Sequence, residues 1–221
     1  MAEYKLELKG ICKSFPGVKA LDNVQLSVRP GTVHALMGEN GAGKSTLIKL
    51  LTGAYKPDEG EMLLDGQPLK VNGPKDAMNM GLTAIYQELN VIPKLTVWEN
   101  IFLGRELRNK KGLLDIPQMK ERSKELLQQL RQNSDVDEKV ENRGMGHQQM
   151  VEICKALVLE SRLIIMDEPT SSLSAGETEE LLRTARELRD RGMAIVFISH
   201  HMDEIFRICD RLTVLRDGCV I

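Results

Sequence analysis

Residues 38–46 of this 221-residue chain read Gly38-Glu39-Asn40-Gly41-Ala42-Gly43-Lys44-Ser45-Thr46, and they are its most diagnostic segment. It fits the pattern G-x-x-x-x-G-K-[ST], whose glycines let the backbone curl so that successive N–H groups point at phosphate oxygens. A short apolar strand, His34–Met37, precedes it, and a helical pattern, Leu47–Leu51, follows it and closes at Gly53. This order of strand, loop and helix predicts a P-loop that binds a nucleotide at the start of the helix.

Two side chains of this loop are expected to do the polar chemistry. Lys44 is predicted to reach the β- and γ-phosphates, and the Ser45 hydroxyl is available to Mg²⁺. The loop residues that we predict to hold the nucleotide are Gly38, Asn40, Gly41, Gly43, Lys44, Ser45 and Thr46.

Composition limits the class of protein. The length suits one sizeable core with room for a subdomain. The net charge of −2 argues against a dedicated nucleic-acid binder, which is usually basic. No apolar run approaches the ~20 residues of a membrane span, and the N-terminus has no signal-peptide pattern. Four widely separated cysteines without metal spacing predict reduced, mostly buried thiols at Cys12, Cys154, Cys209 and Cys219.

The remaining patterns predict an α/β protein with a mostly parallel sheet and a small antiparallel sheet. Short alternating runs at Tyr4–Leu8, Val24–Val28 and Glu61–Leu64 favour antiparallel strands beside the P-loop unit. Continuous apolar runs at Leu163–Met166 and Ala194–Ile198 are typical of buried parallel strands. The other expected elements are strands at Leu82–Tyr86 and Leu212–Leu215, helices at Ile116–Arg131, His147–Val158, Glu177–Arg191 and Met202–Ile208, and a loop at Asn133–Asn142.

Two acidic residues, Asp167 and Glu168, follow the buried strand Leu163–Met166. A carboxylate at the end of a buried strand beside a P-loop holds Mg²⁺ or its water, and Asp167 has that place. Glu168 is predicted to polarise an attacking water as a general base. Two adjacent acidic residues at a strand end are common in proteins. It is their occurrence together with a P-loop that indicates Mg²⁺ binding and general-base catalysis.

Two further strand ends carry candidate catalytic side chains. His200 follows the strand Ala194–Ile198 and is placed to contact a γ-phosphate, although a lone histidine is more often structural. Gln87 follows the strand Leu82–Tyr86, and its amide is placed to bind Mg²⁺ or to position water.

Together these residues resemble the nucleotide-binding subunits of ABC transporters. The motifs follow the family's order, namely Walker A (Gly38–Thr46), Q-loop (Gln87), signature region (Arg143–His147), Walker B (Leu163–Asp167) with Glu168, D-loop (Ser172–Ser174) and switch histidine (His200). The stretches that look most like the ATPases of ribose, galactose and related monosaccharide importers are Ser14–Leu21, Tyr86–Asn90, His147–Ile153 and Met166–Leu173.

The resemblance implies an organisation. Residues 1–221 would form one cassette, with a helical subdomain at about 88–154 and a P-loop NTPase core, including the antiparallel subdomain, at about 1–87 and 155–221. Phe15 would stack on adenine, although it equally suits a core position. The segment Gln87–Arg105 would face membrane subunits. ATP would lie between two cassettes, with Walker A of one facing the signature, including Gly146, of the other.

The implied activity is Mg²⁺-dependent ATP hydrolysis that drives an importer, in this resemblance an importer of a monosaccharide. The implied partners are a second cassette, fused or separate, the transmembrane permease subunits, and indirectly a periplasmic or extracellular sugar-binding protein, with no nucleic acid. The implied location is the cytoplasmic face of the membrane, as a peripheral subunit. Two alternatives stay open: a soluble ABC ATPase acting on ribosomes or DNA, and a nucleotide-gated dimerisation module with little turnover.

The signature region departs from the family pattern. It reads Arg143-Gly144-Met145-Gly146-His147 where Leu-Ser-Gly-Gly-Gln or similar is usual. The serine hydroxyl is missing at Gly144 and Arg143 replaces an apolar residue, whereas Gly146 keeps the close backbone approach to a γ-phosphate. The sugar-importer ATPases also normally carry two fused cassettes, and this chain carries one.

Overall fold

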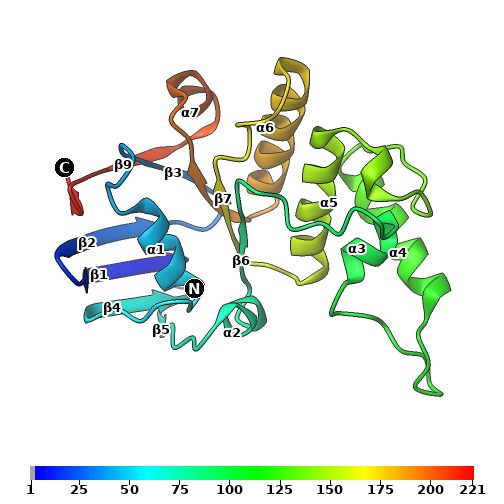
Figure 1. Cartoon of the computed structure of the whole chain (residues 1–221), viewed down its shortest axis with the longest axis horizontal. Helices are drawn as coiled ribbons and strands as arrows, with labels where there is room; N and C mark the ends of the chain where they lie inside the picture. Colours follow the sequence, from blue (N-terminus) through cyan, green and yellow to red (C-terminus); the bar gives the residue numbers. More distant parts are fainter. Residues whose placement is uncertain (1–2) are drawn as a thin grey trace.

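Two β-sheets share one hydrophobic core in the computed structural model, which describes residues 3–221 (Figure 1). The larger sheet has the strand order β10-β9-β3-β8-β7-β6 and the smaller one the order β2-β1-β4-β5. The strands of the larger sheet are β3 (Val33–Met37), β6 (Leu82–Ile85), β7 (Leu163–Asp167), β8 (Ala194–Ile198), β9 (Arg211–Arg216) and β10 (Cys219–Val220). All neighbours in it pair in parallel except β10, which runs antiparallel to β9.

The central parallel strands are buried on both faces, as their continuous apolar sequence predicts. Ile165 of β7 and Val196 of β8 lie in the core shared with the small sheet, whereas Ile164 and Phe197 lie in a second core on the opposite face. Helix α1 (Lys44–Leu51) packs in the first core, and helices α5 (Met145–Val158) and α6 (Ala175–Asp190) pack in the second. The sheet is therefore covered on both faces, which leaves its strand ends as the natural place for a polar site.

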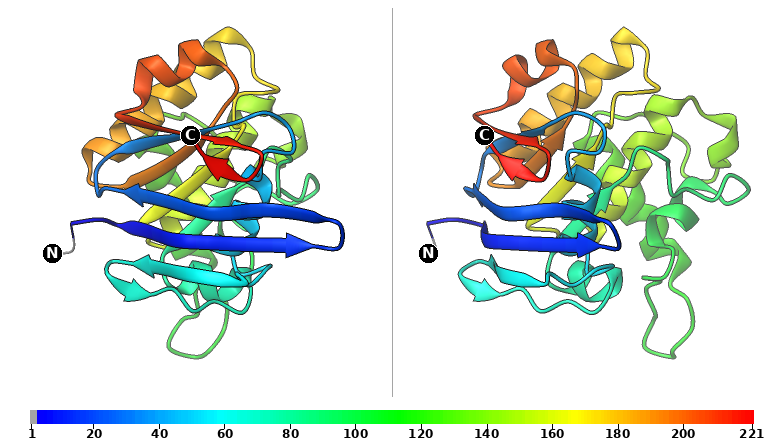
Figure 2. Two further views of the ribbon diagram at one scale, coloured as in Figure 1. Left: turned by 90° about the vertical axis from the view of Figure 1, so that its left-hand side faces the viewer. Right: turned by 60° about the vertical axis from the view of Figure 1, so that its left-hand side comes forward.

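The small sheet is antiparallel and consists of β1 (Leu6–Phe15), β2 (Val18–Val28), β4 (Glu59–Leu64) and β5 (Gln67–Pro68) (Figure 2). The predicted strand Tyr4–Leu8 is too short, because β1 continues to Phe15. The register between β1 and β2 shifts between Leu8 and Ile11, around Gly10 at φ +64°. This irregularity breaks the alternation of the sequence and hides the second half of the strand.

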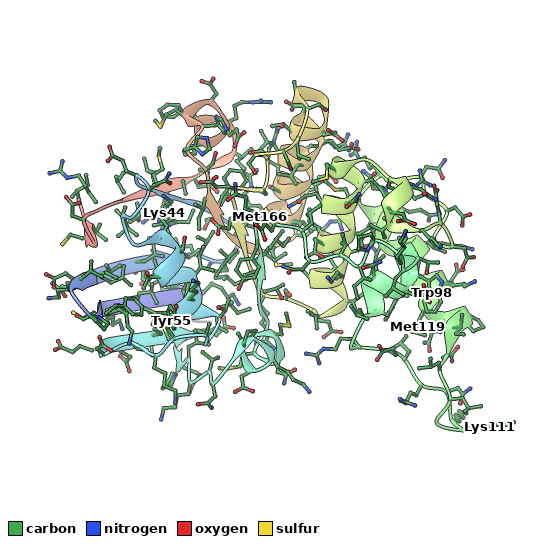
Figure 3. The ribbon with its side chains drawn as sticks, viewed as in Figure 1. Lys44, Tyr55, Trp98, Lys111, Met119 and Met166 are labelled. Carbon is green, nitrogen blue, oxygen red and sulfur yellow. The ribbon has the colours of Figure 1, made fainter. Side chains whose placement is uncertain are left out.

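The remaining helices surround the large sheet, and those between residues 97 and 158 form the helical part at the right of Figure 1. In chain order, the helices after α1 are α2 (Pro74–Asn79), α3 (Val97–Phe102), α4 (Ile116–Gln129), the 3-10 turn η1 (Val140–Asn142), α5 (Met145–Val158), α6 (Ala175–Asp190) and α7 (Met202–Ile208). Trp98 of α3 and Met119 of α4 lie in the helical part at the right of Figure 3, and Lys111 lies at the tip of the loop that projects from it. Residues of α3, α4 and α5 belong to the second core together with residues of the sheet, so this helical part packs directly on the sheet.

Several sequence-based expectations were wrong in detail. Helices α2 and α3 were not predicted, because six residues are too few to show a helical period. The predicted loop Asn133–Asn142 ends in the turn η1, and α5 begins at Met145 rather than His147. The thiols are free, but Cys154 is the only fully buried one of the four. Within residues 3–221 we find no helix with both the length and the apolar composition needed to cross a membrane.

Candidate active site

The predicted Walker residues meet in a cavity of about 540 Å³ at the carboxyl ends of the parallel strands. Lys44 at the start of α1 and Met166 of β7, the residue before Asp167, flank this region in Figure 3. The cavity is lined by Phe15, Val18, Lys19, Ala20, Asn40, Gly41, Gly43, Lys44, Ser45, Thr46, Gln87, Asp167, Glu168, Asp217 and Gly218. Residues from five separate stretches of sequence are thus brought together by the fold.

The P-loop needs glycine at Gly43 for two reasons. Its φ of +108° is a conformation that other residues rarely adopt, and a Cβ there would lie 2.7 Å from the carbonyl oxygen of Ala20. Gly43 is also the N-cap of α1, and no side chain caps this helix. Because the first turn contains no acidic residue either, the N–H groups of Lys44, Ser45 and Thr46 face the cavity mouth without a side-chain acceptor. This arrangement fits an anionic phosphate.

The Lys44 ammonium is fixed in the middle of the loop. Its Nζ donates to the carbonyl oxygens of Gly38 at 2.6 Å and Glu39 at 3.0 Å. Two backbone dipoles therefore hold the only lysine of the P-loop where phosphate oxygens would lie above the N-terminus of α1.

Asp167 is half-buried at the end of β7. Burial raises the pKa of its carboxyl group above the usual range, and the negative charge of Glu168 adds to this, whereas Lys44 lowers it. A cation beside Asp167 would offset both unfavourable effects. Asp167, Ser45 and Gln87 also line an adjoining hollow of about 520 Å³.

The donors around this hollow fit Mg²⁺ rather than a metal held by protein alone. Within residues 3–221 no three His, Cys, Asp or Glu side chains lie close enough to hold a metal ion together. Mg²⁺ is usually held by one or two protein oxygens together with substrate phosphates and water. One carboxylate and one hydroxyl at the P-loop match that requirement.

Glu168 and His200 lie on adjacent strand ends and face each other. Nδ1 of His200 is 3.5 Å from Oε1 of Glu168, and the side chains are 60% and 20% exposed, respectively. Both line a hollow of about 350 Å³ with Gly38, Glu39, Asn40 and Lys44. Glu168 has φ +46°, and its N–H donates to the Ile198 carbonyl at 2.9 Å, which fastens the acidic turn to β8.

Phe15 and Gln87 lie at the rim of the cavity. Phe15 is half-buried and its ring packs edge-on against Tyr55 at 5.2 Å between centroids. It lines the cavity while it packs on the protein, so the ring has both a core-facing and a cavity-facing side. Gln87 is exposed just after β6 and lines both the main cavity and the adjoining hollow.

The signature region is not part of this cavity. Gly144 is the N-cap of α5 and supplies no side-chain cap, and the Arg143 guanidinium pairs with Glu138. The N–H of Gly146 donates at 3.0 Å to Oε1 of Glu177 in α6. Of the predicted site residues, Gly146 is therefore the one that the fold places away from the others.

Sequence reasoning missed some of the residues at the cavity and behind it. Asp217 and Gly218 line it from the turn before β10, and Gly218 is needed there because a Cβ would lie 2.9 Å from the Ala20 carbonyl oxygen. The sequence shows this turn as Asp-Gly but gives no sign that it folds back onto the P-loop. A further hollow of about 620 Å³ is lined by residues between Tyr55 and Asn72 and contains none of the predicted residues.

Comparison with known proteins agrees with this geometry. Residues 21–171 match the family model described as ABC transporter, and the chain therefore belongs to the ABC transporter family. Two similar relatives are the putative ribose/galactose/methyl galactoside import ATP-binding protein 1 of Burkholderia cenocepacia (50% identical) and the ribose import ATP-binding protein RbsA 1 of Rubrobacter xylanophilus (50% identical). The matches cover 99% and 98% of this chain but only 42% and 43% of those proteins, so the chain spans less than half of their length.

Solved structures show the same fold. The chain is similar to the ADP conformation of MJ1267, an ATP-binding cassette of an ABC transporter, with a TM-score of 0.86 and 28% identity over 99% of this chain and 89% of that one. It is also similar to the dimeric post-hydrolysis state of the cassette MJ0796 bound to ADP and Pi, with a TM-score of 0.82 and 26% identity over 97% and 96% of the two chains. The fold is therefore the α/β P-loop fold of ABC cassettes.

Proposed function

We propose that this chain is the ATP-binding and hydrolysing cassette of an ABC importer, with a monosaccharide as the transported substrate. The observation that carries the proposal is the placement of Lys44, Asp167, Glu168 and His200 around adjoining hollows at one sheet edge. The names of the relatives, which are sugar import ATP-binding proteins, support the substrate class. An importer cassette implies permease subunits as partners, a sugar-binding protein upstream, and a peripheral position on the cytoplasmic face of the membrane.

The P-loop residues bind the nucleotide. The α1 N-terminus and the Lys44 ammonium offset phosphate charge, with Gly38, Asn40, Gly41, Gly43 and Thr46 completing the loop. The face of Phe15 turned to the cavity would stack on adenine. Ser45 and Asp167 would hold Mg²⁺, with the Gln87 amide as a further oxygen, and the ion supplies charge neutralisation of the phosphates when bound.

Glu168 acts as the general base. Its partly buried carboxylate accepts the proton of the attacking water, and the proton resides on Oε of Glu168 until the site opens. His200, whose Nδ1 is 3.5 Å from that carboxylate, orients it and would contact the γ-phosphate. Most of the rate enhancement comes from this positioning and from charge stabilisation, because phosphoryl transfer needs little covalent help from the protein.

A second cassette would complete each site. The signature region lies outside the cavity of its own chain, and its exposed residues Gly144 and Met145 would face the nucleotide of a partner cassette, whereas Gly146 is buried against Glu177. The missing hydroxyl at Gly144 weakens what this chain offers to that partner. This same observation favours a second candidate function, a nucleotide-gated dimerisation module in which the site facing Gly144 binds ATP with little turnover.

The test is Glu168→Gln in the assembled transporter. The amide keeps the shape but cannot accept the proton, so ATP should stay bound while turnover falls on the order of 100-fold or more. Glu121→Gln, an exposed glutamate of α4, is the matched control and should turn over like the wild type. Near-wild-type turnover of Glu168→Gln would contradict the assignment, and failure of ribose or galactose to stimulate turnover would contradict the substrate class.

A further inference from the structure

Glu204 is a buried carboxylate next to the candidate active site that the proposed chemistry does not use. It lies in α7, which begins two residues after His200, and the residue is only 8% exposed. None of the ion pairs formed by residues 3–221 includes it. Burying a carboxylate without a cation is unfavourable unless hydrogen bonds compensate, so the contacts of this side chain indicate what it is for.

One oxygen of Glu204 joins two loops. Its Oε2 accepts hydrogen bonds from Oγ of Ser199 at 2.7 Å and from Oγ1 of Thr170 at 2.9 Å. Both hydroxyl residues are themselves buried, Ser199 at 3% and Thr170 at 6% exposure. The Ser199 Oγ in turn accepts from the backbone N–H of His201 at 3.0 Å.

These contacts hold the two sides of the Glu168–His200 pair. Thr170 lies two residues after Glu168, in the turn that follows β7. Ser199 and His201 flank His200 after β8, and the two bonds of the Ser199 hydroxyl close a small loop around it. The 3.5 Å approach of His200 to Glu168 therefore depends on where Glu204 places the two loops.

We propose that Glu204 is a positioning residue that sets the His200 loop against the Glu168 turn through the hydroxyls of Ser199 and Thr170. This inference rests on the proposed ATPase function and adds to it a residue that touches neither nucleotide nor water. A purely structural role for α7 does not require this network, because Asp203 already supplies an acidic side chain to the first turn of that helix. Without Glu204 the His200 loop loses its buried acceptor while the P-loop stays intact.

The kinetic test compares Glu204→Ala, Glu204→Gln and Asp203→Ala in the assembled transporter. Glu204→Ala should lower kcat on the order of 10- to 100-fold with little change in the KM for ATP, because misplacement of reacting groups by about 1 Å costs that much. Glu204→Gln keeps an oxygen that can accept both hydroxyl bonds and should restore most of kcat. Asp203→Ala, an exposed neighbour on the same turn, should match the wild type.

A double-mutant cycle with His200→Ala shows whether Glu204 acts through His200. We expect Glu204→Ala to add little to the loss already caused by His200→Ala, because the loop then has no imidazole to position. A loss of equal size in both backgrounds, or an increase in KM with kcat unchanged, would overturn the proposal. Failure of Glu204→Gln to restore kcat would also overturn it.

A readout without nucleotide completes the test. In the nucleotide-free chain the amide hydrogen of His201 should exchange on the order of tenfold faster in Glu204→Ala and Ser199→Ala than in Asp203→Ala. Ser199→Ala removes the hydroxyl that accepts from this amide, and Glu204→Ala removes the carboxylate that holds the hydroxyl in place. Unchanged exchange in Glu204→Ala would overturn the proposal.

A comparison of turnover in the assembled transporter separates this proposal from the proposed ATPase function. If the wild type and Glu168→Gln do not differ in turnover, the ATPase assignment fails. If they differ and Glu204→Ala is fully active, only the role of Glu204 is rejected.

Discussion

The backbone N–H of Gly146 donates a hydrogen bond to the carboxylate of Glu177, which connects the N-terminus of α5 to the N-terminus of α6. Oε2 of the same carboxylate accepts from the N–H and hydroxyl of Ser174 in a capping box. These three hydrogen bonds hold the pKa of Glu177 below its usual range, the Ser174 hydroxyl contributing most. Glu177 thus supplies to α5 the cap that a serine at position 144 would otherwise provide.

The first prediction concerns Gly146. A Cβ there would lie 2.7 Å from Cγ of Glu177, so Gly146→Ala should displace that side chain and break both caps. We expect a loss of about 1 kcal/mol in the free energy of unfolding, measured with urea. In a Glu177→Ala background the same change should be neutral or stabilising, because alanine is the better helix former.

Gly176→Ala in the first turn of α6 is the matched control for that experiment. A Cβ at Gly176 meets nothing within 4 Å, so this variant should be at least as stable as the wild type. If Gly146→Ala costs the same in the presence and absence of Glu177, the contact between these two residues is not what requires a glycine.

The second prediction concerns Lys44. Lys44→Ala removes the only P-loop ammonium and both of its carbonyl contacts, and the affinity for ATP should fall roughly tenfold or more. The measurement is a titration with a fluorescent ATP analogue, with Lys124→Ala, an exposed lysine of α4, as the control. Equal affinity in Lys44→Ala and Lys124→Ala would argue against the assigned phosphate site.

The third prediction concerns Gly144. A serine fits there, because a Cβ would meet only Oε1 of Glu177, at 3.5 Å. We expect Gly144→Ser to change total turnover of the two-cassette assembly by less than about twofold if, as in the second candidate function, the ATP that it faces stays bound with little turnover. Glu168→Gln should remove most turnover in either background. A large gain from Gly144→Ser, with most of it surviving Glu168→Gln, would mean that both composite sites hydrolyse ATP.

The fourth prediction is a pH dependence of stability that comes from His34. His34 lies in β3, the strand just before the P-loop, and its Nε2 is 2.8 Å from the hydroxyl of Thr213 in β9. Burial, with a smaller effect from Arg211, lowers the pKa of His34 from its usual value near 6.5 to about 4. Between pH 6.5 and about 4, the folded chain therefore keeps the imidazole neutral, whereas the unfolded chain binds a proton there.

Stability from His34 should be complete above pH 6.5 and should decline as the pH falls from 6.5 to about 4. The total loss should be about 3 kcal/mol, by the free energy equivalent of the pKa shift. Urea unfolding between pH 7 and 4 should show a shallower decline for His34→Gln than for the wild type. Equal slopes in His34→Gln and the wild type would exclude His34 as the source of this pH dependence.

The class of fold and the polar residues of the candidate site can be predicted from local sequence patterns. The P-loop, the acidic pair at Asp167 and Glu168, and His200 are all readable, because each follows an apolar strand whose pattern is set by burial on both faces. The family assignment followed from their order and is confirmed by the comparison over residues 21–171.

The residues that support the candidate site become apparent only in the folded chain. Glu204, Thr170 and Ser199 meet through buried hydrogen bonds between α7 and two strand ends, and Gly146 meets Glu177 across 31 positions of sequence. A carboxylate on a short amphipathic helix looks like a solvated charge in the sequence, because burial depends on which neighbour the helix packs against. Local patterns record periodicity and turn chemistry, whereas hydrogen bonds between distant loops exist only after the chain has folded.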